Sequence, residues 1–247
     1  MRVERVAPYR ARIAAGSRGA KGSALASAEP RTLPVDAIAA LTTRTSPAGL
    51  VAPAPDADAL EWMLRAAMRA PDHGRLRPWR FIVIEAAARA ALGDVLADAL
   101  QRREPSVADA ALAKERAKPL RAPLIVVVAA KLREHRGVPA VEQIVAAGAA
   151  AQNMLVAAHA LGFGGFWRTG AAAYDDHVKR ALGIRAEDSI VGFVYLGTPS
   201  AQAPPLPAPN VEAHVTRWTG PANEAASETA AVAGPQVVSG PALPDRQ

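Results

Sequence analysis

Arginine and hydroxyl side chains stand together at one predicted helix end of this 247-residue chain. Arg44, Thr45 and Ser46 place a guanidinium and two hydroxyls on three consecutive residues. Such a set can satisfy several oxygens of one phosphate group, because the arginine can bind two of them at once. The same triplet is also typical of a solvated helix C-terminus. The residues alone therefore leave a phosphate site and a helix cap both open.

Polar groups stand at two further element ends. Arg69 closes a helical pattern, and His73 follows it in the loop APDHGRLRPW, between Pro71 and Pro78. The other group follows a glycine-rich turn and consists of Trp167, Arg168 and Thr169. Each group has a structural alternative. Arg69 can complement the helix dipole, His73 can be a loop hydrogen-bonder, and 167–169 can be a core aromatic residue before a solvated strand end.

Several kinds of active site are excluded by what the sequence lacks. Because it has no cysteine, the chain has no disulfide, no cysteine-liganded zinc and no thiol nucleophile. No two histidines stand at the helical spacing of a metal site; they are His73, His135, His159, His177 and His214. A Gly-x-Ser-x-Gly elbow, a P-loop and a GxGxxG fingerprint after a strand are also absent. We therefore expect no metal site and no catalytic side-chain nucleophile.

Hydrophobic periodicity predicts the elements that position these groups. One helix, capped by Asp56 or Asp58 and ended by Pro71, carries an apolar stripe of Leu60, Met63, Leu64, Ala67 and Met68. Other helices are predicted over 34–43, 86–118, 141–161 and 174–182, and strands over 81–84, 124–128 and 190–196. The strand 124–128 is apolar on both faces and should be central. Three strands between long helices indicate an α+β domain.

Four segments of the chain resemble the flavin (FMN)-dependent nitroreductase superfamily, in the same order and spacing. They are RAAMRAPDHGRLRPWRFIVIE (65–85), RAPLIVVVAAK (121–131), EQIVAAGAAAQNMLVAAHALGFGGFWRTG (142–170) and DSIVGFVYLGTP (188–199). Within the first segment, APDH followed by PWRF is similar to the YdjA-like branch. The resemblance implies a nitroreductase-like fold with a central mixed β-sheet flanked by helices, in a domain-intertwined homodimer. It also implies non-covalent FMN at two sites in the dimer interface.

The family pattern also assigns roles to individual residues. Arg44, Thr45 and Ser46 match the phosphate and ribityl site, although Thr45 stands where close relatives often have a second arginine. Arg69 and His73 match groups that reach the flavin from the same or the partner chain. Trp167, Arg168 and Thr169 match the segment along the isoalloxazine. A region associated with nicotinamide-nucleotide binding matches Ala157, Ala158, His159, Ala160, Leu161 and Gly162.

The implied activity is hydride transfer from NAD(P)H through FMN to an electron-poor small molecule, such as a nitroaromatic or a quinone. In this ping-pong scheme the flavin N5 carries the chemistry, so no catalytic side chain is needed. Two alternatives stay open: an FMN-binding storage or sensor protein with poor turnover, and a flavin enzyme of the same fold with a different acceptor.

The two ends of the chain differ from its middle. Residues 1–31 carry seven Arg or Lys against two acids, which supplies +5 of the formal +6, and residues 219–247 are rich in Ala, Pro and Gly. Neither end shows the apolar periodicity of a folded core, so we expect a disordered basic extension (1–31), an FMN-binding domain (32–218) and a disordered tail (219–247). We expect a cytoplasmic protein with no membrane span and no nucleic-acid partner.

Overall fold

The computed structural model describes residues 36–201, 204 and 206–220. The chain divides into two compact units between Pro205 and Leu206. In the second unit the described residues contain one short 3₁₀ helix, η4 (Glu212–His214). The basic extension expected over 1–31 and nearly all of the tail expected over 219–247 lie outside the described residues, so both stay predictions.

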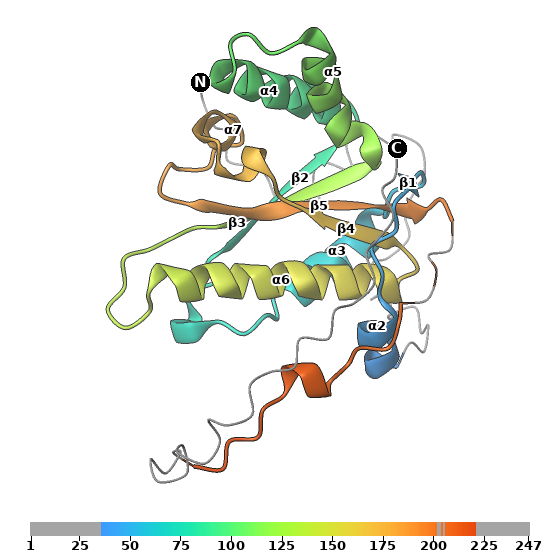
Figure 1. Ribbon diagram of the computed structural model, residues 1–247, viewed down its shortest axis with the longest axis vertical. Coiled ribbons are helices and arrows are strands. Elements are labelled where there is room, and N and C mark those ends of the chain that lie inside the picture. Colours follow the sequence, from blue (N-terminus) through green and yellow to red (C-terminus); the bar gives the residue numbers. More distant parts are fainter. Residues whose placement is uncertain (1–35, 202–203, 205, 221–247) are drawn as a thin grey trace, which may run out of the picture. The chain divides into compact units, whose positions relative to one another are not determined.

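A β-sheet forms the middle of the first unit (Figure 1). Its strands are β1 (Leu50–Val51), β2 (Trp79–Glu85), β3 (Leu124–Ala130), β4 (Gly164–Arg168) and β5 (Ser189–Pro199). The order is β1-β5-β3-β2, and β4 pairs with β5 as well. The three strands expected from the sequence are confirmed, and β3 lies between β2 and β5 as expected.

The expectation of a mixed sheet is wrong for the described part of the chain, where every strand pair is antiparallel. The reason lies in the long connections. Glu85, which ends β2, pairs with Leu124, which begins β3. The segment with the helices between them therefore leaves and re-enters the sheet at the same end of the strands. Likewise Ala130 at the end of β3 pairs with Ser189 at the start of β5. The apolar pattern of a strand does not show at which end of the sheet a connection re-enters, so the sequence does not give the strand directions.

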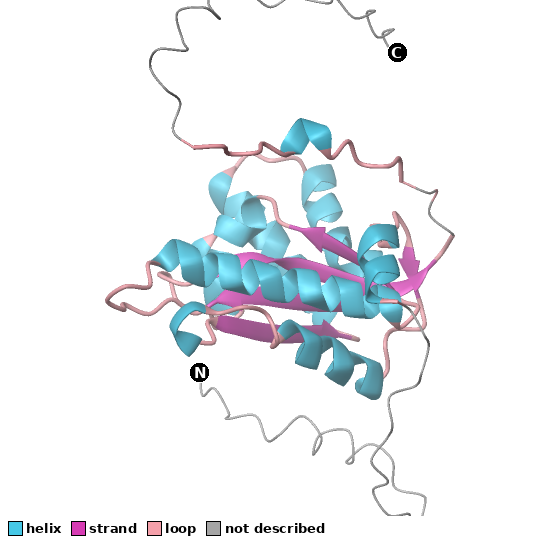
Figure 2. Ribbon diagram, turned by 90° about the horizontal axis from the view of Figure 1, so that it is seen from below, coloured by secondary structure: helices cyan, strands magenta, loops and turns pink. Residues whose placement is uncertain are grey.

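Helices cover both faces of the sheet, as Figures 1 and 2 show. The α-helices of the described part are α2 (Ala37–Thr43), α3 (Ala57–Ala67), α4 (Ala88–Arg103), α5 (Asp109–Ala117), α6 (Ala140–Ala160) and α7 (Asp176–Ala181). Short 3₁₀ helices are η1 (His73–Arg75), η2 (Lys118–Arg121) and η3 (Ala171–Tyr174). The predicted helices are confirmed, with 86–118 divided into α4 and α5. Asp56 caps α3 by accepting a hydrogen bond from the Ala59 N–H.

The alternation of β3 explains the two layers. Ile125, Val127 and Ala129 pack with α4 and α7 on one face, whereas Leu124, Val126 and Val128 pack with α3 and α6 on the other. All six side chains are at most 1 % exposed. A strand that is buried on both faces reads as one apolar run, which is why the sequence identified it.

Two strands, β1 and β4, were missed from the sequence. The glycines of GFGGFWRTG predict a turn, but Gly164 and Gly165 begin β4. A Cβ at Gly164 would lie 2.7 Å from Pro47 Cγ, and one at Gly165 would lie 2.5 Å from Leu155. These glycines therefore permit close packing of a strand.

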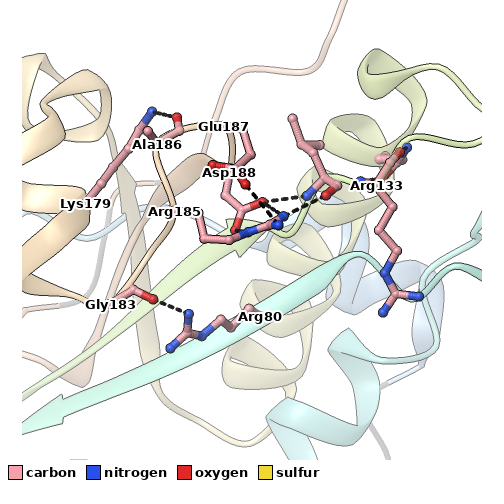
Figure 3. A network of polar contacts seen from close by, with 10 residues as sticks. Arg80, Arg133, Lys179, Gly183, Arg185, Ala186, Glu187 and Asp188 are labelled. Atoms are coloured by element: carbon pink, nitrogen blue, oxygen red, sulfur yellow. Dashed lines mark hydrogen bonds and ion pairs between the residues drawn. The ribbon is translucent and has the colours of Figure 1, made fainter. Parts of the chain in front are cut away.

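A polar network fixes the loop that leads into α6 (Figure 3). The carboxylate of Asp188, only 4 % exposed, accepts hydrogen bonds from Arg185 and from the Leu132 N–H at 2.8 Å. Arg185 also donates to the Leu132 carbonyl. The buried Gln143 side chain accepts from the Arg133 N–H and donates to the Arg133 carbonyl. The start of α6 is thus tied to both β3 and β5.

Candidate functional site

The triplet Arg44, Thr45 and Ser46 directly follows α2 and lies beside the last turn of α6. Arg44 Nη1 donates to the Thr45 carbonyl at 3.1 Å and lies 3.4 Å from Ser46 Oγ. The Thr43 hydroxyl lies 2.9 Å from His159 Nε2, which joins α2 to α6 at this point. Two groups that the sequence assigned separately, the phosphate triplet and the segment 157–162, therefore meet in the fold.

Residues 157–162 form the last turn of α6 and the turn that follows. Ala158 is fully buried in the core, and Gly162 has a φ of +83°, which a glycine adopts without strain. His159 and Ala160 are half-buried, and Gly162 is exposed. A nucleotide at this place would therefore contact the outer residues of the segment and not Ala158.

Trp167 and Arg168 end β4 with their side chains on opposite faces of the sheet, and Thr169 follows the strand directly. Trp167 packs with the α3–α6 layer, and its indole N–H donates to the Val191 carbonyl at 3.2 Å. The Arg168 guanidinium lies on the opposite face, 3.9 Å from the centroid of the Phe166 ring. From Gly164 beside Pro47 to Arg168, the strand covers about 13 Å at 3.3 Å per residue. The triplet at 44–46 and the 167–169 run therefore lie near opposite ends of one short strand.

His73 lies at the far end of α6 from the triplet. His73 Nδ1 lies 2.5 Å from Glu142 Oε2, in the first turn of α6, and Arg69 is exposed just beyond α3. Glu142 and His159 are 17 residues apart on one helix, which corresponds to about 25 Å. Within one chain, the predicted flavin groups therefore fall into separate places.

The loop that carries His73 is held by a hydrogen bond within it and by one from the residue that follows β3. Asp72 Oδ2 accepts a hydrogen bond from the Arg77 N–H at 2.6 Å, and the Pro78 carbonyl accepts one from Lys131 N–H. Arg75 and Arg77 both have positive φ, at 55° and 48°. Backbone in this region is unfavourable for a side-chain-bearing residue, and it persists where the surroundings impose it.

Sequence reasoning missed a group of charged residues around a cavity of about 390 Å³ beside the end of β4. The lining includes Arg103, Glu115, Lys118, Arg121 and Tyr195, together with the run 166–172. The available signal was the basic pair around Pro119, directly before the buried strand β3. This basic pair lines a cavity only together with residues of α4 and β5, which are distant in the sequence and close in the fold. In the described part of the chain, no cluster of His, Asp and Glu could hold a metal ion.

Comparison with known proteins identifies the family. The model of the nitroreductase family matches residues 41–198 of this chain. The chain belongs to the nitroreductase family. It is 45% identical over 169 residues to the Escherichia coli K12 protein named "Putative NAD(P)H nitroreductase YdjA", which covers 68% of this chain and 91% of that one. This similarity places the chain in the YdjA-like branch of the family, as the sequence motifs predicted.

Solved structures confirm the nitroreductase fold. A nitroreductase-like family protein from Bacillus cereus superposes with a TM-score of 0.65 at 21% identity, covering 75% of this chain and 97% of that one. A Desulfovibrio desulfuricans protein named "putative nitroreductase in complex with FMN" superposes with a TM-score of 0.56 at 24% identity, covering 74% of this chain and 98% of that one. The α+β, nitroreductase-like fold class is therefore confirmed. No helix in the described residues of this chain has the length and hydropathy to cross a membrane.

Proposed function

We propose that this protein is an FMN-dependent NAD(P)H oxidoreductase that reduces a small electron-poor acceptor. The observation that carries the proposal is the arrangement of the residue groups along β4 and α6. The phosphate triplet stands at one end of β4 and the 167–169 run at the other, at a separation suited to an extended flavin nucleotide. The names of its relatives, which include an NAD(P)H nitroreductase and a complex with FMN, support the same cofactors.

The residues present fit FMN. The Arg44 guanidinium uses one nitrogen for its own loop, and its other N–H groups can bind phosphate oxygens together with Ser46. In the described part of the chain β4 pairs only with β5, so backbone N–H groups on its other edge can face the flavin ring. Reduction of a flavin places negative charge at N1 and C2=O. Backbone donors at 167–169 or the Arg168 guanidinium would stabilise that charge.

The chemistry that FMN supplies when bound is hydride transfer from NAD(P)H to an acceptor such as a nitroaromatic or a quinone. The protein then has to bind and orient FMN, NAD(P)H and the acceptor and to polarise the flavin, and it needs no nucleophilic side chain. The outer residues of 157–162 would contact the nicotinamide nucleotide. His159 belongs to that segment and also contacts Thr43 beside the phosphate triplet.

The active form is a homodimer in this proposal. His73 lies about 25 Å from the phosphate triplet along α6, too far to complete its site within one chain. The outer face of α6 carries Val141 and Val145, which are 62% and 64% exposed. An exposed apolar face of this kind suits a second copy of the chain. A partner packed there would bring its own His73 loop to the flavin, in a cytoplasmic enzyme with two sites.

The test is the visible spectrum of the purified protein and its response to NADPH and NADH without oxygen. We expect flavin peaks that bleach within the mixing time and recover when a nitroaromatic or quinone is added. Bound flavin that resists both nucleotides would favour a storage or sensor protein. A colourless protein that FMN does not reconstitute would overturn the assignment of Arg44, Ser46, Arg69, His73 and Arg168.

A further inference from the structure

One side chain among the described residues forms a hydrogen bond with the His73 imidazole, and it is the carboxylate of Glu142 in the first turn of α6. His73 Nδ1 lies 2.5 Å from Glu142 Oε2, although the two residues are 69 positions apart in the sequence. An ionised carboxylate only accepts hydrogen bonds, so Nδ1 carries a proton in this contact. A neutral His73 ring therefore has its free electron pair on Nε2, which makes no hydrogen bond to any residue that the structure describes.

Both ends of this contact stand on packed backbone. Gln143, which directly follows Glu142, is 2% exposed and donates a hydrogen bond to the Val138 carbonyl at 3.2 Å. Val138 in turn packs against the loop next to His73, since a Cβ at Gly74 would lie 3.3 Å from Val138 Cγ2. The contact therefore fixes the direction of the imidazole ring relative to α6 and does not merely join two loose side chains.

The same two side chains border the outer face of α6. His73 and Glu142 line a cavity of about 310 Å³ together with Val145 and Ala149. Val145 belongs to the exposed apolar face on which a second copy of the chain packs in the proposed dimer. The side chains of His73 and Glu142 are 60% and 44% exposed, so both have surface left that a partner copy and its cofactor can contact.

Glu142 also has a simpler role, which has to be separated from its contact with His73. A carboxylate in the first turn of a helix stabilises that helix through the helix dipole, whatever its neighbours are. The dipole effect needs the negative charge, whereas support of His73 needs an acceptor oxygen at the position of Oε2. The two roles therefore predict different results for Glu142→Gln, which removes the charge and keeps an oxygen.

We propose that Glu142 is a positioning residue of the flavin site. It holds the His73 ring with Nδ1–H toward α6, which leaves Nε2 available to the FMN site of the partner copy. A ring that is already ordered loses less conformational entropy when FMN binds, so Glu142 raises the affinity for FMN. This inference rests on the proposed function, in which the His73 loop of one chain reaches the flavin held by the other.

The first test is nitrogen-15 NMR of the labelled full-length protein at about pH 9, where histidine side chains are neutral. We expect the His73 signal, identified by its loss in His73→Ala, to show a proton on Nδ1 and none on Nε2. Glu142→Ala should give a mixture of the two tautomers, because no acceptor then selects the proton on Nδ1. A proton on Nε2 in the parent protein, or an unchanged tautomer in Glu142→Ala, would overturn the hold of Glu142 on His73.

Fluorescence titration of the apoprotein with FMN measures the effect on the cofactor. We expect Glu142→Ala to raise the Kd for FMN about fivefold, close to the most that an ion pair of this exposure contributes. Glu142→Gln should keep most of the affinity, because its amide oxygen can accept from Nδ1–H although the charge is lost. An equal loss of FMN affinity in both variants would assign the effect to the helix dipole and overturn the proposal.

A double-mutant cycle shows whether Glu142 acts through His73. In the His73→Ala background, Glu142→Ala should have no further effect on the Kd for FMN. A loss of the same size with and without the imidazole would overturn the positioning role. Glu134→Ala is the matched control, because Glu134 is an exposed acid of the loop before α6 that makes no hydrogen bond or ion pair with its side chain among the described residues. It should leave the Kd unchanged, and a loss equal to that of Glu142→Ala would also overturn the proposal.

The same titrations separate this inference from the proposed function. If the Glu142 variants bind FMN as expected but neither NADPH nor NADH reduces the flavin, the proposed function fails while the role of Glu142 stands. If the nucleotides reduce the flavin and the affinity for FMN does not depend on Glu142, the inference fails while the proposed function stands. A protein that binds no FMN overturns both.

Discussion

The hydroxyl of Thr43 lies 2.9 Å from Nε2 of His159, and it also donates to the Ala39 carbonyl at 2.7 Å. Because its own proton is used on Ala39, the hydroxyl accepts from His159, which must carry a proton on Nε2. This contact joins the ends of α2 and α6 directly before Arg44.

Loss of that contact should loosen the phosphate triplet. We expect Thr43→Val to raise the Kd for FMN several-fold, because the first residue of the triplet loses its support from α6. Fluorescence titration of the apoprotein measures this. Thr42→Val is the matched control, since Thr42 also donates to a helix carbonyl, of Ile38, but has no contact with His159. An equal loss of FMN affinity in both variants would show that the effect comes from α2 itself and not from the contact between Thr43 and His159.

Arg44→Gln should weaken FMN binding about tenfold or more, because it removes a charged partner of the phosphate. Riboflavin, which has no phosphate, should bind the variant and the parent protein equally well. A parallel loss for FMN and riboflavin would contradict a phosphate role for Arg44.

Val145→Asp should convert the proposed dimer to a monomer and remove bound flavin, since it places a charge on the exposed face of α6. Light scattering and the ratio of flavin to protein absorbance measure both effects. Leu120→Asp changes an apolar side chain that is 53% exposed elsewhere and should leave both unchanged. If the Val145→Asp variant remains a dimer with full flavin content, the exposed face of α6 is not part of the dimer interface.

Asp188→Asn should lower the free energy of unfolding by about 1–3 kcal/mol at pH 7, because a buried charged acceptor loses its partners. Burial opposes ionisation of Asp188, but hydrogen bonds from Arg185 and Leu132 outweigh it and hold the pKa below the ordinary 3.8. The stabilisation is therefore present above pH 3.8 and lost as the pH falls through the lower folded-state pKa.

Urea unfolding of both proteins from pH 7 to pH 3 checks the Asp188 prediction. The difference between them should shrink at the acid end. Glu187→Gln is the control, because Glu187 is exposed and pairs with the same Arg185. A difference that stays constant over the whole pH range would exclude ionisation of Asp188 as the cause.

Gly192→Ala should cost about 1–3 kcal/mol, because a Cβ there would overlap the Trp167 indole and displace its hydrogen bond to Val191. Gly148→Ala has the opposite expectation. Its Cβ would lie 3.7 Å from the same indole, an ordinary contact, and alanine favours a helix over glycine by about 0.5–1 kcal/mol. Urea unfolding followed by tryptophan fluorescence measures both. Equal effects of the two substitutions on the free energy of unfolding would show that the Trp167 indole does not pack closely against Gly192 of β5.

Much of the fold could be predicted because the patterns are local. The strand 124–128 is apolar on both faces, Asp56 begins a helix, and the four family segments fix the order of the elements. The strand β4 could not be predicted, because its glycines have meaning only when Pro47 and Leu155 are packed against them. The antiparallel directions depend in the same way on where the long connections return.

The sequence by itself determined the family, the α+β class and the residue types that suit a flavin phosphate, because these depend on local pattern and residue chemistry. Only the tertiary structure decided which groups meet. It joined Thr43 to His159, separated His73 from Arg44 by most of the length of α6, and placed Trp167 and Arg168 on opposite faces of one strand. It also gathered Arg121, Arg168 and Tyr195 around one cavity. Contacts between distant segments are set by packing, which no short stretch of sequence records.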